Sequence, residues 1–143
     1  MRIWLAAVGR ARPGPARALF EEYAGRLNWP LTLREVELRK RVAAADAKRR
    51  EAELLLAAVP ATATVIALDE RGRNLSSEDF AARLGAWRDG GVGDLALLVG
   101  GADGLDAGLR ERADLVLALG TMTWPHMMVR AMIAEQVYRA QQI

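Results

Sequence analysis

The sequence predicts a single three-layer α/β domain, residues 1–143, around a mostly parallel β-sheet. Two observations predict this class. Five short apolar segments have the length and residue types of buried strands, and helical segments separate most of them along the chain. The chain is also long enough to bury about two-thirds of its unfolded surface in one core. Its hydrophobic fraction of 52% and charged fraction of 27% are ordinary for a globular protein.

The N-terminal half predicts two strands and two helices. Residues 3–8 form an apolar first strand, and Pro15 stands where a helix can begin. That helix has apolar residues at the three- and four-residue spacing of an amphipathic helix: Ala18, Leu19, Tyr23 and Leu27. Residues 31–38 alternate as a second strand. Residues 41–59 are rich in alanine and charge, which predicts a long helix that ends before Pro60.

The C-terminal half predicts three strands and two helices. Residues 64–68 are a β-branched third strand that ends at the turn 69–72. Ser76 caps a helix that runs to about Trp87, because it can accept from the amide three residues on. The fourth and fifth strands, 95–99 and 115–119, each run into a loop that contains glycine. A helix over 127–142 closes the sequence.

Three loops of the predicted sheet are candidates for a ligand site, because ligands bind beyond the carboxyl ends of parallel strands. These loops begin at Leu68, Gly100 and Gly120. None of the glycine-containing segments is a phosphate cradle. Gly9 and Gly14 have the spacing of a P-loop, but proline and alanine follow where lysine and serine or threonine are needed. The loops therefore favour a nucleoside-like ligand without phosphates. The alternative for the Gly100 loop is an ordinary strand-to-helix turn.

Composition excludes several kinds of chemistry. The chain has no cysteine and only one histidine, His126. Disulfides, thiolate zinc sites, a cysteine nucleophile and a multi-histidine metal site are therefore excluded, and we expect no metal. No apolar run approaches the roughly 20 residues of a membrane span, and the apolar N-terminus is too short for a signal peptide. The expected location is the cytoplasm.

Charge is distributed unevenly along the chain. Residues 1–50 carry 12 Lys and Arg against 5 Asp and Glu, whereas the net charge of the whole chain is only +2. The basic residues gather at 39–41 and 48–50, and Arg10, Arg12 and Arg17 lie near the start. A basic half predicts a polyanionic partner, with nucleic acid the first candidate. The alternative for any one cluster is a solvated helix face.

The late motifs resemble one known family. They are Val99-Gly100-Gly101-x-x-Gly104-Leu105, Leu119-x-x-Met122-Thr123-x-Pro125-His126, Met128-x-Arg130 and Ile133-x-Glu135-Gln136-Val137-Tyr138-Arg139-Ala140. Together with Ala7-Val8-Gly9, Glu22-Tyr23, Leu68-Asp69-x-x-Gly72 and Ser76-Ser77, they resemble the SPOUT methyltransferases. Within that class the chain resembles the small bacterial enzymes that methylate N3 of a pseudouridine in 23S rRNA.

The resemblance implies a C-terminal trefoil knot, S-adenosylmethionine as the methyl donor, and a homodimer with the last helix in its interface. It implies action on rRNA in the ribosome. The cofactor contacts that it implies are Leu68, Gly100, Leu119, Gly120, Thr121, Met122, Thr123 and Trp124. Family members continue into a short tail with tyrosine, histidine and arginine that approaches the substrate, whereas this sequence stops at Ile143. A non-catalytic RNA-binding or ribosome-assembly module with the same fold is the alternative function.

The closing helix carries the candidate substrate contacts. Its apolar residues cannot share one stripe, so we expect burial by the sheet on one side and by a second subunit on the other. His126 is either a hydrogen-bonding contact of the target base or a structural cap. Arg130, one turn later on the same face, holds RNA or forms a buried salt bridge. Glu135 and Arg139 are spaced to pair with each other. The resemblance implies attack by N3 of the base, which must lose its proton, and this favours a neighbouring hydrogen-bond acceptor or general base.

Overall fold

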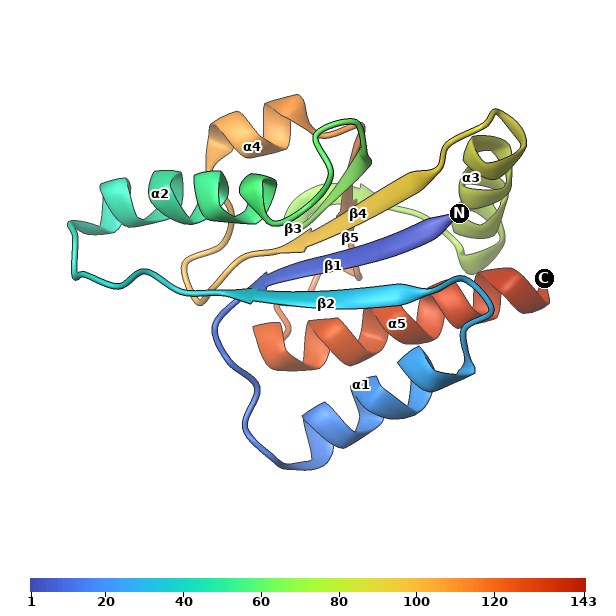
Figure 1. The fold of residues 1–143 in the computed structure, drawn as a ribbon, viewed down its shortest axis with the longest axis horizontal. Coiled ribbons are helices and arrows are strands. Elements are labelled where there is room, and N and C mark those ends of the chain that lie inside the picture. The colour runs from blue at the N-terminus through green and yellow to red at the C-terminus, as the bar shows by residue number, and fades with distance from the viewer.

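A computed structural model describes residues 1–143 as a five-stranded sheet between two layers of helices (Figure 1). All strand pairs are parallel, in the order β2-β1-β4-β3-β5. The strands are β1 (Arg2–Val8), β2 (Leu31–Val36), β3 (Thr64–Asn74), β4 (Asp94–Val99) and β5 (Leu115–Ala118). The three-layer α/β class is confirmed, and the sheet is entirely parallel, where the sequence predicted a mostly parallel one.

The helices cover both faces of the sheet. Those on one face are α1 (Pro15–Arg26), α3 (Ser77–Asp89) and α5 (His126–Gln142), and those on the other are α2 (Ala44–Ala57) and α4 (Ala107–Arg112). No helix of the structure is long and apolar enough to cross a membrane. The Ser76 cap is confirmed, since its hydroxyl oxygen accepts from the Asp79 amide at 3.0 Å.

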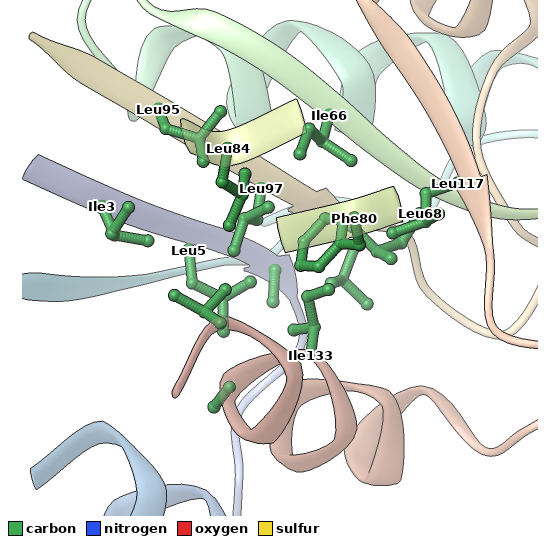
Figure 2. Packing of buried hydrophobic residues seen from close by; sticks show 14 of the residues in the cluster. Ile3, Leu5, Ile66, Leu68, Phe80, Leu84, Leu95, Leu97, Leu117 and Ile133 are labelled. Carbon is green, nitrogen blue, oxygen red and sulfur yellow. The ribbon is translucent and has the colours of Figure 1, made fainter. Parts of the chain in front are cut away.

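The larger of the two cores lies between the sheet and helices α1, α3 and α5. Figure 2 shows Ile133 of α5 directed toward this core, where Leu5, Leu97 and Phe80 meet it from β1, β4 and α3. Ile133 is fully buried, and burial of such a side chain stabilises the fold by roughly 1.5–3 kcal/mol. The core therefore fixes α5 against the sheet, and with it the start of that helix.

The third strand differs from its prediction. Its last six residues, 69–74, are polar and contain Gly72, which is why the sequence suggested a turn. In the structure the strand continues, and after a shift of register Arg73 and Asn74 pair with β5. The close packing depends on Gly72, because a Cβ there would lie 2.6 Å from the Val116 backbone.

The trefoil knot implied by the resemblance stays a prediction.

Smaller differences concern helix bounds. Helix α2 begins at Ala44 and ends at Ala57, inside the predicted 41–59, and β2 ends at Val36 instead of residue 38. The short helix α4 was not predicted. In the structure Asp106 caps this helix by accepting from the Gly108 amide at 3.0 Å, and Leu109 is its one buried residue. A capping aspartate and a single apolar residue are a weak pattern for a helix of six residues.

Candidate functional site

A cavity of about 520 Å³ lies where the middle of β3 and the carboxyl ends of β4 and β5 meet the start of α5. Residues 68–71 of β3, the loops after β4 and β5, and the first residues of α5 form its wall. The lining residues are Leu68, Asp69, Glu70, Arg71, Val99, Gly100, Gly101, Ala102, Asp103, Gly104, Leu117, Leu119, Gly120, Met122, Thr123, Trp124, Pro125, His126 and Val129. The three segments proposed from the sequence thus meet at one cavity, although the segment that begins at Leu68 is a continuation of strand β3 and not a loop.

The loop after β4 folds tightly back on itself. The Gly104 amide donates to the Gly101 carbonyl at 3.1 Å, and Gly104 has a φ of +83°, which favours glycine. A Cβ at Gly100 would lie 2.7 Å from the Gly104 carbonyl oxygen. The wall of the cavity is therefore backbone at this point, and its shape depends on the absence of a side chain at position 100.

The loop after β5 is tied to β3 and to itself. The Gly120 amide donates to Asn74 Oδ1 at 3.1 Å, and the Thr123 hydroxyl donates to Glu70 Oε2 at 2.6 Å. The indole N–H of Trp124 donates to the Leu119 carbonyl at 2.8 Å. These bonds join two walls of the cavity, so the position of the 119–125 loop depends on the unpredicted second half of β3.

The wall of the cavity is acidic. Asp69, Glu70 and Asp103 line it, and Arg71 is the only Lys or Arg among the lining residues. The Asp69 side chain is 5% exposed, accepts from the Arg71 amide at 2.9 Å, and lies 3.9 Å from Arg110. Just behind the loop, burial and the nearby Asp103 raise the pKa of the Glu51 carboxyl. Such a wall disfavours phosphate and favours a ligand with positive charge.

Seven of the eight cofactor contacts implied by the resemblance line this cavity. The eighth, Thr121, is exposed in the same loop but is not part of the wall. Their role in binding stays a prediction. Sequence reasoning quoted Asp69 in a motif but selected neither aspartate as a site residue, although Asp69 follows the buried half of β3 and Asp103 lies between two glycines of the loop.

The two candidate substrate contacts of α5 lie in different surroundings. His126, the first residue of the helix, lines the cavity. The Arg130 side chain is only 2% exposed and donates to Glu35 Oε2 at 2.6 Å and to the carbonyls of Gly9 and Val8 at 2.9 and 3.3 Å. Of the two interpretations of Arg130, this structure contains the buried salt bridge, and a contact with RNA stays a prediction.

Glu35 is a residue that sequence reasoning missed. Burial raises the pKa of its carboxyl, but hydrogen bonds from Arg130 and from the Ala11 amide, with nearby positive charge, outweigh this and lower the pKa overall. The partners Glu35 and Arg130 lie 95 residues apart, so no local pattern signals the pair. The predicted pair of Glu135 and Arg139 is confirmed, with Nη2 and Oε1 2.5 Å apart.

The sequence matches a family described as "Predicted SPOUT methyltransferase" over residues 1–143. This chain belongs to the SPOUT methyltransferase family. It is 70% identical to "Ribosomal RNA large subunit methyltransferase H" of Rhodospirillum centenum and 55% identical to the protein of that name from Paramagnetospirillum magneticum. Each match covers 100% of this chain and 94% of the relative.

Solved structures show the same fold in other SPOUT-like proteins. A probable methyltransferase from Bordetella pertussis matches with a TM-score of 0.59 at 15% identity, over 97% of this chain and 95% of that one. The SpoU methyltransferase AviRb from Streptomyces viridochromogenes, in complex with the cofactor AdoMet, matches with a TM-score of 0.51 at 14% identity, over 99% and 61% of the two chains. At these identities the likeness extends to the fold alone.

Proposed function

We propose that this SPOUT chain transfers a methyl group from S-adenosylmethionine to large-subunit ribosomal RNA. The supporting observation is the 70% identity, over its whole length, to a relative named as an rRNA large subunit methyltransferase. From the motifs that this chain shares with that group of enzymes, we further propose that the methyl acceptor is N3 of a pseudouridine in 23S rRNA. Ribosomes are cytoplasmic particles, so the reaction is proposed to take place in the cytoplasm.

The cavity suits this cofactor in size and charge. A volume of about 520 Å³ is within the range of small-molecule sites, and the wall combines apolar side chains with backbone polar groups. S-adenosylmethionine has no phosphate, and it supplies a methyl group already activated on a positively charged sulfonium. Asp69, Glu70 and Asp103 offer the negative charge that such a cation prefers. The seven of the eight implied residues that line the cavity would hold it.

The chain contributes position and proton handling to the reaction. Attack by N3 on the methyl carbon forms an N–C bond, breaks the S–C bond and releases the N3 proton, so an acceptor must lie beside the base. His126 lines the cavity at the start of α5 and is proposed to contact the base by a hydrogen bond. The tight loop at Gly100 and the tied loop at 119–125 would orient the methyl donor toward that base.

We also propose that two copies of the chain form a homodimer through the α1 and α5 side of the molecule. Several large apolar side chains are exposed there or on the adjoining loop: Leu19, Met122, Trp124 and Met128. A second hollow of about 550 Å³ lies between α1, α5 and the start of α3 and shares Leu117, Leu119 and Gly120 with the first cavity. Burial of this surface in a dimer would also close one side of the cofactor loop.

The test of the dimer is a measurement of mass in solution. Sedimentation velocity should give twice the chain mass, and the double variant Leu19→Glu, Met128→Lys should give a monomer with unchanged circular dichroism. The matched variant Arg88→Ala, at the end of α3, should remain dimeric. A parent protein of single-chain mass at micromolar concentration would exclude the proposed dimer.

Cofactor binding and methyl transfer are tested separately. Calorimetry should detect S-adenosylmethionine binding, and His126→Asn should keep this affinity but lose most methyl transfer to ribosomes, with the modified base mapped by mass spectrometry. Failure to bind the cofactor at high micromolar concentration would contradict the proposed enzymatic function and favour the alternative, a non-catalytic RNA-binding module.

A further inference from the structure

The loop between β1 and α1, residues 9–14, lies against the start of α5. It follows β1 at the same edge of the sheet as the cavity. Gly9 opens it with a φ of +96°, and a Cβ added there would lie 3.4 Å from Met127 Cε and 4.0 Å from His126 Nε2. The loop therefore begins beside the histidine that lines the cavity.

Two side chains remote from the loop hold it at two points. Arg130 donates to the Gly9 and Val8 carbonyls, and its other guanidinium nitrogen donates to Glu35. The same carboxylate oxygen of Glu35 accepts from the Ala11 amide at 2.7 Å. Arg130 is only 2% exposed and Glu35 28% exposed, so this is a partly buried connection from α5 through β2 to the loop. A loop bonded in this way loses less freedom when it binds a partner.

The loop presents two arginines to solvent. Arg10 is 80% exposed and lies 3.8 Å from Glu37, the length of a weak ion pair. Arg12 is exposed and takes part in no salt bridge. In contrast, Arg17 and Arg26 of the following helix are each paired with a glutamate. Among the arginines of residues 1–30, Arg12 is thus the one without an ion pair, and Arg10 has only a weak one.

The charges of the cavity and of the loop have opposite signs. The cavity wall carries three carboxylates and one arginine, so an RNA backbone would be repelled from it. A base that reaches the cavity must leave its phosphates outside, and the loop beside His126 is where two arginines can meet them. Phosphate contacts of this kind position a nucleic acid without reading its sequence.

We propose that the β1–α1 loop is a phosphate clamp for the RNA next to the target base, with Arg12 and Arg10 as its contacts. The pair of Arg130 and Glu35 holds the clamp in place and is a positioning pair, not a catalytic one. The inference deepens the proposed methylation of rRNA and rests on it. It assigns a side of the cavity to the substrate and a positioning function to the salt bridge between Arg130 and Glu35.

The first test measures binding of the full chain to ribosomal large subunits over a range of salt concentrations, by co-sedimentation. Arg12→Ala should weaken binding roughly fivefold to tenfold at moderate salt. It should also lower the slope of log affinity against log salt by roughly 0.7–0.9, the value for one lost phosphate contact. The control Arg88→Ala, an exposed arginine paired with Asp89 on α3, should match the parent.

If Arg12→Ala binds ribosomal subunits with the affinity and salt dependence of the parent, the proposed phosphate clamp is wrong. This readout does not depend on activity. A parent that binds ribosomes but transfers no methyl group would instead contradict the proposed reaction, and calorimetry with S-adenosylmethionine separates the two failures, because the clamp variants should keep the parent's cofactor affinity.

The second test uses the sign of a charge effect. Glu35→Gln removes a negative charge near the loop, so simple electrostatics predicts tighter RNA binding. The positioning role predicts the opposite, a KM for ribosomes raised severalfold with kcat and cofactor affinity retained, because the charge-assisted bond to Arg130 is weakened. A lower or unchanged KM in a variant that circular dichroism finds folded would overturn the positioning role.

Discussion

Replacement of Gly100 by alanine is a severe test of the proposed cofactor site, because one added carbon meets backbone. The new Cβ would lie 2.7 Å from the Gly104 carbonyl oxygen and 2.8 Å from the Gly104 carbonyl carbon. Ordinary contact begins at 3.4 Å, so the loop must open by about 0.7 Å at this point. Overpacking of this kind costs about 1–3 kcal/mol.

The displaced segment is itself the wall of the cavity, so we expect the loss to appear in cofactor binding. A cost of about 1.4 kcal/mol corresponds to a tenfold change in affinity. Gly100→Ala should therefore weaken S-adenosylmethionine binding by roughly tenfold to a hundredfold. Methyl transfer should fall further, since displacements near 1 Å in a reacting geometry cost about a hundredfold in rate.

Calorimetry gives the affinity, and thermal unfolding shows whether the domain is intact. Gly93→Ala is the matched control, because a Cβ there meets nothing within 4 Å. Gly93 precedes the amino end of β4, whereas the cavity lies at the carboxyl end of that strand. The control should bind the cofactor as the parent does. Parent-like affinity in Gly100→Ala would show that the cavity is not the cofactor site, or that this loop does not form its wall.

Three further predictions concern stability. Gly72→Ala should destabilise the fold by about 3 kcal/mol in denaturant unfolding, because its Cβ meets β5 backbone at 2.6 Å, whereas Gly25→Ala in α1 should be neutral or stabilising by up to about 1 kcal/mol. The pKa of Glu35 is lowered in the folded state, so its charge stabilises the fold above the ordinary carboxyl pKa, and this contribution is lost as the pH falls through the lowered value. Glu35→Gln should therefore unfold at a lower temperature than the parent at pH 7, with the difference vanishing in acid; an equal difference at all pH values would refute the ionic bond to Arg130. The pKa of Glu51 is raised, chiefly by burial, so its ionised form destabilises the fold as the pH rises above the ordinary carboxyl range. Glu51→Gln should accordingly melt higher than the parent at pH 7 and equally at pH 3, and a lower Tm at pH 7 would contradict this.

The fold was predictable where one local pattern determined the structure. Buried strands such as β1 and β4 are apolar nearly throughout, because both of their faces are covered, and helix α3 carries its cap signal in sequence. The second half of β3 was not predictable in this way. Its residues are polar and include Gly72, and only the passing β5 backbone makes this segment a strand.

The candidate site was likewise predictable in part. Its loops were found because the carboxyl ends of parallel strands converge, a rule that needs only the order of elements. The contacts that shape the site are long-range, as in the bond from Thr123 to Glu70, and no spacing in the sequence signals them. The acidic wall was missed for a similar reason, since Asp69 of β3 and Asp103 of the loop after β4 line one cavity only in the folded chain.

Helix α5 links the parts of the proposed reaction. Its first residue, His126, lines the cavity, and Arg130 one turn later holds the β1–α1 loop from inside. Ile133 fixes the same helix in the core, while Met128 is exposed on the side proposed for the dimer. A shift of this helix by a fraction of a turn would therefore move the base contact, the phosphate clamp and the dimer surface together. The buried Arg130 is costly to desolvate, and its hydrogen bonds to Glu35 and to the Val8 and Gly9 carbonyls offset that cost.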